Sequence, residues 1–228
     1  MYSCFGEPEK VRLRRLDGQP LTHHAPEYVV RPPVPQTLLP PCLADARIRI
    51  VDFGEAFLSA ECIPKHLHTP VWFAAPEVLF RDPVGPPSDI WALACLLYNV
   101  FGNESLFESF YGDRDEILVG MTYTFGRLPN RWWDRWEKRA DYFAEDGTTY
   151  AGYKRAGPVN IRSRLQLLTP ATLGGLDADE MAAFESILLG MLRFEPGKRM
   201  SAKEVVQLLP GVCGNKRAFD VRNLKFTW

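Results

Sequence analysis

The residues best suited to chemistry lie in the short stretch VDFGEAF, residues 51–57. The apolar run that leads into it predicts a short buried strand over about residues 47–51. Asp52 follows this strand, and Gly54 allows the chain to turn sharply away. An aspartate before such a turn is either a turn residue or a ligand for a metal ion, and this stretch alone leaves both interpretations open.

A second set of possible metal ligands is the C-x₃-H-x-H pattern of Cys62, His66 and His68. A zinc site needs a fourth ligand at a known spacing, and the pattern supplies none. We therefore predict a loop with solvated histidines here, and the same for His23 and His24. The chain has 5 cysteines, never in CxxC spacing, which favours reduced thiols and a location in the cytoplasm or nucleus.

The composition restricts the possible partners. Hydrophobic residues make up 46% and charged residues 24% of the 228 residues, as in soluble globular proteins. The net charge of −1 argues against direct binding to nucleic acid or to an acidic membrane surface. No apolar run approaches the roughly 18 to 20 residues that span a bilayer, and the start lacks a signal-peptide core. We expect no nucleic-acid partner and no membrane segment.

The elements that must position Asp52 follow from prolines and hydrophobic periodicity. Residues 1–44 are rich in proline and predict an extended or loosely ordered arm. Residues 55–87 predict a loop, with one short helix that begins at Pro76. The rest is predicted to be mainly α, with helices over residues 88–101, 114–126, 130–143, 177–194 and 201–209.

The helix starts carry recognisable signals. Four of these helices begin with a residue that can cap an N-terminus: Ser88, Asn130, Asp177 and Ser201. The last two add Glu180 and Glu204 three positions later, which is the capping-box pattern. The helix over residues 88–101 is apolar almost all round, which predicts that it lies in the middle of the fold.

Four short motifs then resemble the C-terminal lobe of eukaryotic protein kinases, in the same order and at similar spacing. They are DFG (52–54), APE (75–77), DIWALA (89–94) and EPGKRMSAKEVV (195–206). The details DFGEAF, LHTP, APEVLF and GRLPNRWW are similar to the serine/arginine-rich protein kinase branch, especially its fungal members. The resemblance implies a mainly α, kinase-like C-lobe with a short β element before DFG.

The same resemblance implies the domain limits. The C-lobe would cover residues 45–210, and residues 211–228 would form a C-terminal tail. The proline-rich arm, residues 1–44, is similar to an insert that some members carry just before DFG.

The resemblance also implies a cofactor, ATP with Mg²⁺. Asp52 would ligate the metal ion that bridges the nucleotide phosphates, Phe53 would pack inward beside it, and Gly54 would complete the cofactor-binding turn. The activation segment would include a threonine and the APE motif: Thr69, Ala75, Pro76 and Glu77. Thr69 stands one residue further from Glu77 than is usual in the family.

Four residues would have structural roles by the same resemblance. Glu77 would pair with Arg199 and so tie the activation segment to the helical core, because a buried carboxylate needs a charged partner. Asp89 would accept backbone hydrogen bonds from the catalytic loop, and Trp91 would anchor its helix in the core. Ala94 replaces the usual glycine of the family.

Two further clusters each have two interpretations. An acidic run is usually a solvated face, but beside this resemblance it is also a candidate docking surface for arginine-rich segments: Glu104, Glu108, Asp113, Asp115 and Glu116. Three tryptophans at helical spacing favour core packing over a ligand-stacking platform or a partner anchor: Trp132, Trp133 and Trp136.

Other parts of a kinase site do not occur in this sequence. It has no GxGxxG stretch, no VAIK-like lysine and no HRDxxxxN run, so no catalytic residue is identifiable. We expect a serine/threonine kinase family member, acting on a protein substrate, present as a C-lobe without its N-lobe and inactive alone. The alternatives are a non-catalytic, pseudokinase-like binding module for arginine-rich or other protein partners, and a decayed remnant.

Overall fold

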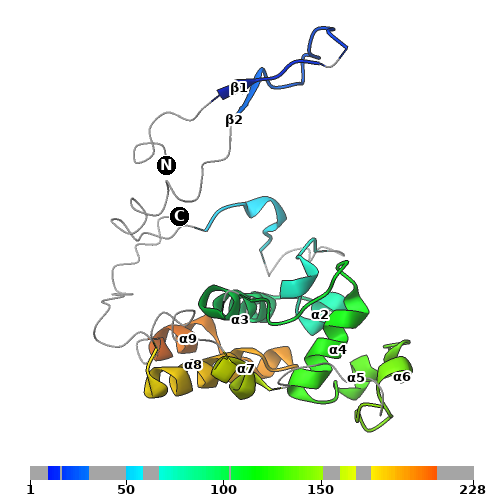
Figure 1. Ribbon diagram of the computed structural model, residues 1–228, viewed down its shortest axis with the longest axis vertical. Helices are drawn as coiled ribbons and strands as arrows, with labels where there is room; N and C mark the ends of the chain where they lie inside the picture. The colour runs from blue at the N-terminus through cyan, green and yellow to red at the C-terminus, as the bar shows by residue number, and fades with distance from the viewer. Residues whose placement is uncertain are drawn as a thin grey trace. The chain divides into compact units, whose positions relative to one another are not determined.

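The computed structural model describes residues 10–15, 17–30, 50–58, 67–102, 104–150, 160–167 and 176–209 (Figure 1). The chain divides into two compact units, residues 1–52 and 53–228. The boundary between these units falls inside the DFG motif, between Asp52 and Phe53.

The first unit contains a small antiparallel hairpin that the sequence did not predict. Strand β1 (Lys10–Arg12) pairs with β2 (Tyr28–Val30), so that Lys10 lies opposite Val30. All six strand residues are exposed, and the ammonium group of Lys10 lies 4.7 Å from the ring centre of Tyr28. The prediction of an extended or loosely ordered arm over residues 1–44 did not include this pairing, because two three-residue strands give only a weak local signal.

The strand predicted over residues 47–51 is not seen where the structure describes it. Ile50 and Val51 carry no strand and are 75% and 60% exposed, and the earlier residues lie outside the described ranges. A strand needs a neighbour for its backbone hydrogen bonds, and no described segment pairs with these two residues. The structure therefore contains a β element before DFG, but at residues 10–30.

The second unit is helical, as predicted. Two 3₁₀ turns, η2 (Phe53–Glu55) and η3 (Val71–Phe73), precede the α-helices, and η4 (Pro196–Lys198) precedes the last one. The α-helices are α2 (Pro76–Leu79), α3 (Pro86–Gly102), α4 (Arg114–Phe125), α5 (Asn130–Trp133), α6 (Arg139–Tyr142), α7 (Ile161–Leu167), α8 (Ala178–Met191) and α9 (Ala202–Leu208). No described helix has both the length and the hydropathy of a membrane-spanning segment.

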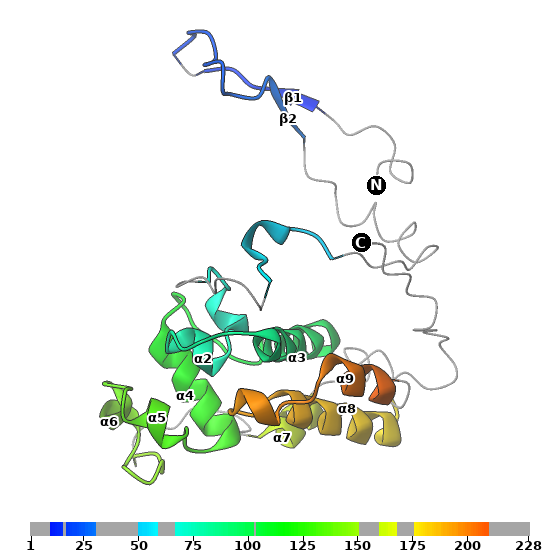
Figure 2. The same ribbon diagram turned by 180° about the vertical axis from the view of Figure 1, so that it is seen from behind.

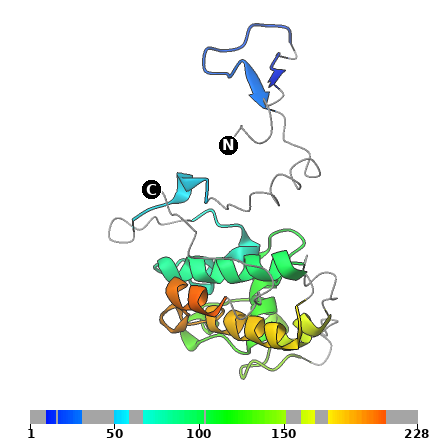
Figure 3. The same ribbon diagram turned by 90° about the vertical axis from the view of Figure 1, so that its left-hand side faces the viewer.

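The core forms where α3 packs on α8, with α7 and α9 against α8 (Figures 1 and 2). Trp91 of α3 is fully buried, and its ring is stacked 5.9 Å from that of Phe107. Figure 3 shows α3 running across this unit beside α8 and α9. Burial of such large aromatic side chains provides much of the hydrophobic stabilisation of a domain of this size.

The prediction that the helix over residues 88–101 lies in the middle of the fold holds for only one face of α3. Leu93, Leu96 and Val100 are 37%, 46% and 67% exposed. Their spacing of three and four residues places them on one face of the helix, away from the buried face that carries Trp91. The helix therefore has a buried stripe and an exposed apolar stripe.

The capping boxes of α8 and α9 are confirmed. Asp177 accepts hydrogen bonds from the amides of Asp179 and Glu180, and Ser201 accepts one from the amide of Glu204. In both helices the glutamate side chain returns to the capping residue's own amide. Pro76 also occupies the first turn of α2, as predicted.

Two other predicted caps are wrong. Ser88 lies inside α3, which begins two residues earlier at Pro86 because proline fits the first turn of a helix. Asn130 is the first residue of α5, and its side chain accepts a hydrogen bond from Arg127 rather than capping the helix. The single helix predicted over residues 130–143 is two short ones, α5 and α6, and α7 was not predicted.

Candidate functional site

The DFG turn places its side chains in solvent. Asp52 has a φ of 68°, in the left-handed region that residues other than glycine rarely adopt. Phe53, which the resemblance implied to pack inward, is 67% exposed. That expectation is wrong for this chain, because the described side chains leave most of the ring uncovered. Gly54 follows within η2 and is also exposed.

The described residues do not fit a complete Mg²⁺–ATP site. Magnesium takes six oxygen ligands in octahedral geometry, usually from carboxylates, phosphates and water. In the described ranges, no group of three acidic, histidine or cysteine side chains is arranged to hold a metal ion. Asp52 contributes a single carboxylate, so we derive no chemical step through a bound metal or nucleotide.

A hydrogen-bonded contact joins the turn after DFG to the start of the later segment. The Nδ1 atom of His68 lies 3.0 Å from Oε2 of Glu55, and this hydrogen bond lowers the pKa of the Glu55 carboxyl. Both side chains are exposed, as are His23 and His24. Solvated histidines are therefore confirmed at these positions, whereas Cys62 and His66 lie outside the described residues.

The best-defined site in the second unit is a buried ion pair. Glu77, in α2, is 2% exposed, and Arg199 follows η4 with 8% of its surface exposed. The Nη1 and Nη2 atoms of Arg199 donate to the two carboxylate oxygens of Glu77 at 2.6 and 2.7 Å. The hydroxyl of Ser88 also donates to Glu77, at 2.7 Å. The structure thus brings together the two residues that the resemblance implied as partners.

The remaining hydrogen bonds of Arg199 explain why its charge can be buried. Its Nε donates to the carbonyl of Arg193, Nη1 to that of Pro87 and Nη2 to that of Phe194. Together with Glu77 these acceptors use all five N–H groups of a guanidinium. The guanidinium carbon also lies 5.1 Å from the ring centre of Trp91. One side chain therefore holds α2, the start of α3 and the segment after α8 together.

The other two residues with implied structural roles differ in environment. Trp91 lies at the centre of the core and is fully buried. Asp89 is exposed and accepts no hydrogen bond from the described part of the chain. Partial burial nevertheless raises the pKa of the Asp89 carboxyl. The hydrogen bonds implied for Asp89 are therefore not formed by the residues that the structure describes.

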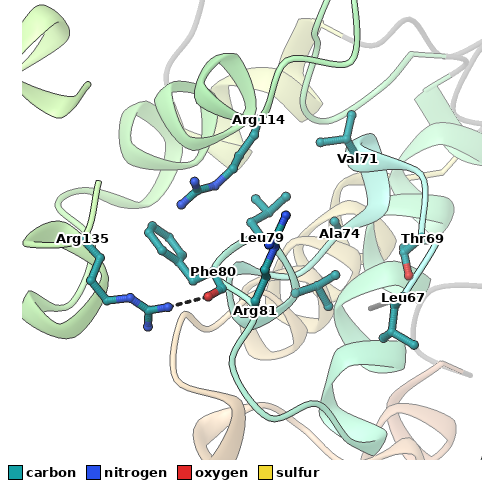
Figure 4. A pocket seen from close by; sticks show the side chains of 10 residues that line it. Leu67, Thr69, Val71, Ala74, Leu79, Phe80, Arg81, Arg114 and Arg135 are labelled. Carbon is teal, nitrogen blue, oxygen red and sulfur yellow. Dashed lines mark hydrogen bonds between the residues drawn. The ribbon is translucent and has the colours of Figure 1, made fainter. Parts of the chain in front are cut away.

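The activation-segment residues lie in two different environments. Ala75 and Pro76 are buried beside Glu77 at the start of α2. Thr69 is half-buried and lines a pocket of about 450 Å³ that also reaches α2 and α4 (Figure 4). Thr69 therefore lines the same pocket as Arg81, Arg114 and Arg135.

The acidic run is partly used within the fold. Asp113 caps α4 by accepting from the amide of Asp115 at 2.7 Å. Asp115 accepts hydrogen bonds from Nε1 of Trp136 and Nζ of Lys138, both at 2.9 Å. Glu116 accepts from a backbone amide of the preceding loop. These contacts reduce the negative charge that the run can offer to a partner.

The other two acidic residues lie on the loop between α3 and α4, which also carries two exposed aromatic rings. Glu104 and Glu108 are exposed on this loop. Phe110 and Tyr111 are 93% and 94% exposed, with their ring centres 6.3 Å apart. No sequence pattern predicted the exposure of these two rings, because large aromatic residues are usually buried.

The three tryptophans belong to the core, so the packing interpretation is confirmed. Trp132 and Trp133 are fully buried and Trp136 is 1% exposed. Trp132 also donates a hydrogen bond to Asp82 at 2.7 Å, and Arg135 forms an ion pair with the same carboxylate at 2.6 Å. These contacts span about 50 residues, so no periodic signal in the sequence could have revealed them.

Comparison with known proteins agrees with the geometry. Residues 41–208 match the family described as the protein kinase domain. The chain is 30% identical over 164 residues to the dual specificity protein kinase CLK1 of Mus musculus, covering 70% of this chain and 32% of that protein. It is 27% identical over 164 residues to the serine/threonine-protein kinase SRPK of Physarum polycephalum, covering 70% and 37%. It is 25% identical over 172 residues to the probable serine/threonine-protein kinase dyrk2 of Dictyostelium discoideum, covering 75% and 18%.

These features define a helical domain in which a buried arginine, Arg199, binds the glutamate of the APE motif, Glu77. The chain belongs to the protein kinase domain family, with serine/threonine and dual-specificity kinases among its relatives. It spans between 18% and 37% of the length of the three relatives named above.

Proposed function

We propose that this chain forms the C-terminal part of a serine/threonine protein kinase, of the serine/arginine-rich branch, that transfers phosphate from ATP to protein substrates. The observation that supports this most strongly is the Glu77–Arg199 pair. It fixes the APE motif onto the helical core, which is the arrangement that the family resemblance implied. Such a kinase would act in the cytoplasm or nucleus on arginine/serine-rich segments.

We also propose that the 228-residue chain alone does not transfer phosphate. Phosphoryl transfer depends on holding Mg²⁺, the nucleotide phosphates and the acceptor hydroxyl in line. Asp52 is the one residue of this chain to which the resemblance assigns such a role, and a single carboxylate cannot position all three.

The exposed apolar stripe of α3, which includes Leu93, Leu96 and Val100, is a surface suited to packing against a further segment.

The experiment compares the recombinant chain with the native protein isolated by an antibody raised to residues 177–209. Both are incubated with radiolabelled ATP, Mg²⁺ and a peptide of Arg-Ser repeats. We expect incorporation by the native protein, and incorporation by the recombinant chain no higher than that of its Asp52→Asn variant. Transfer by the recombinant chain above the variant would disprove inactivity, and absence of transfer by the native protein would disprove the kinase assignment.

A second candidate is a binding module for arginine-rich segments. The exposed rings of Phe110 and Tyr111, on the same loop as the exposed Glu104, favour it, because guanidinium groups stack on aromatic faces and pair with carboxylates. We expect the Arg-Ser peptide to bind the recombinant chain without nucleotide, and the double variant Phe110→Ala/Tyr111→Ala to bind it several-fold more weakly. Unchanged binding by the double variant would rule out this surface.

A further inference from the structure

The pocket beside Thr69 has one apolar wall and one strongly basic wall (Figure 4). Its volume of about 450 Å³ lies in the range of sites that hold small ligands or a few residues of a peptide. The apolar wall comes from the segment before α2 and from α2 itself: Leu67, Val71, Ala74, Val78 and Leu79.

Three arginines from three different elements form the basic wall. Arg81 follows α2, Arg114 begins α4, and Arg135 follows α5. Figure 4 shows Arg114 and Arg135 on either side of the Phe80 ring, with the Arg135 guanidinium bonded to the carbonyl of Phe80. Their guanidinium carbons lie 4.5 and 5.5 Å from the centre of that ring.

The positive charge of this wall is only partly compensated. No carboxylate lines the pocket in the described part of the chain. Arg135 has an ion pair with Asp82, but neither Arg81 nor Arg114 pairs with any described carboxylate. Partial burial lowers the pKa of Arg114, and repulsion from Arg135 and Arg81 adds to this effect, while the charges of Asp115 and Glu137 oppose it. An anion bound between the three arginines would reduce the repulsion among them.

The backbone at Arg81 carries a further cost. Its φ of 56° lies in the left-handed region, which for a residue with a side chain is about 1–2 kcal/mol less favourable than the right-handed one. A glycine would adopt this conformation without that penalty. This conformation ends α2, because it lets the amide of Asp82 donate to the carbonyl of Glu77 at 2.8 Å.

We propose that this pocket binds the phosphate group of a phosphorylated serine or threonine in a protein partner, with an adjacent apolar side chain against Leu67 and Val71. A phosphate monoester carries a charge of about −1.5 to −2 at neutral pH, which suits the guanidinium groups of Arg81 and Arg114, neither of which forms an ion pair with a described carboxylate. Arginine binds phosphate oxygens through paired N–H groups, which gives both affinity and orientation.

The shape of the pocket favours a peptide over a nucleotide. A nucleotide base needs an aromatic face on which to stack, and the arginines lie over the ring of Phe80. The inference goes beyond the proposed function, because such binding requires neither ATP nor phosphoryl transfer.

The test uses the full 228-residue chain and no nucleotide. Two fluorescent peptides, Ala-Leu-pSer-Val-Ala and Ala-Leu-Ser-Val-Ala, are titrated and their anisotropy is measured. We expect the phosphopeptide to bind at least roughly 10-fold more tightly, and Arg114→Gln or Arg81→Gln each to remove most of that difference. Arg162→Gln is the matched control, because Arg162 is an exposed arginine of α7 that pairs with Glu185. It should bind like the parent.

Equal affinity for both peptides would overturn the proposal. So would an equal loss in Arg162→Gln, which would show nonspecific attraction, or inorganic phosphate competing as strongly as the phosphopeptide, which would show a free-anion site. The Arg81→Gly variant distinguishes a loss of phosphopeptide binding from a loss of folding stability. It should lose phosphopeptide affinity while its urea midpoint rises, because glycine relieves the strained backbone. A variant that keeps its phosphopeptide affinity would exclude Arg81 from the site.

Discussion

Arg199 and Glu77, 122 residues apart in the sequence, form a bidentate ion pair in which the arginine side chain is fully buried. This ion pair holds together two segments that are distant along the chain, and backbone carbonyls accept from the other three N–H groups of the arginine. The cost of removing two charges from water is offset only while both partners are present. This dependence leads to the first prediction.

Removing one partner should destabilise the fold far more than removing both. Glu77→Met leaves a buried guanidinium without its counterion, and we expect a loss of about 3–5 kcal/mol in the free energy of unfolding. The double variant Glu77→Met/Arg199→Met should recover part of this loss. Urea denaturation of the four proteins of the cycle gives the coupling energy. Additive losses would contradict the structure.

Ser88 should matter through Glu77. Its hydroxyl donates to Oε1 of the buried carboxylate, so Ser88→Ala removes a hydrogen bond to a charged group, at a cost of about 1.5–3 kcal/mol. The same substitution in a Glu77→Met background should cost much less, because the acceptor is gone. Both differences come from urea midpoints. An equal cost in the two backgrounds would mean that Ser88 stabilises α3 in some other way.

The Asp82 carboxylate should make stability depend on pH in the acid range. Burial raises its pKa, but hydrogen bonds from Arg135 and Trp132 outweigh this and leave the pKa below the ordinary 3.8. The contribution of a carboxyl with a depressed pKa is present in full above the unfolded-state value and is lost as the pH falls through the folded-state value. The stability advantage of the parent over Asp82→Asn should therefore shrink below pH 3.8.

This advantage is measured as the difference in urea midpoint between the two proteins, from about pH 6 to about pH 2.5. Arg135→Gln, which removes one donor to Asp82, should show a smaller acid-dependent loss than the parent. A difference between parent and Asp82→Asn that stays constant over the whole range would contradict the prediction.

Two neighbouring tryptophans should respond differently to the same substitution. Nε1 of Trp136 donates to Asp115, whereas Nε1 of Trp133 is buried and has no acceptor in the described part of the chain. Trp136→Phe should therefore cost about 1 kcal/mol more than Trp133→Phe, since the loss of volume is the same. Far-UV circular dichroism in urea measures both. A larger loss for Trp133→Phe would show that packing around Trp133 outweighs the hydrogen bond.

Local signals in the sequence predicted helix starts only where local contacts control them. The box formed by Asp177 and Glu180 involves residues three positions apart, and it is present as expected. Ser88 has an equally good local signal, but its hydroxyl bonds to Glu77, 11 residues away in the sequence, and the helix begins earlier. Asn130 is likewise diverted from capping by Arg127. In both cases a charged side chain forms a hydrogen bond with the polar atom that was expected to cap the helix, although Glu77 is 11 residues from Ser88 and Arg127 only three residues from Asn130.

The sequence by itself determined the family, the mainly α character of residues 88 onward and the pairing expected for Glu77, because ordered motifs and hydrophobic periodicity are properties of the chain alone. Only the tertiary structure decided that Phe53 is exposed, that α3 keeps an uncovered apolar stripe and that three arginines line one pocket. The physical reason is that exposure and charge compensation depend on which distant segments approach a side chain. The spacing of residues along the chain does not contain that information.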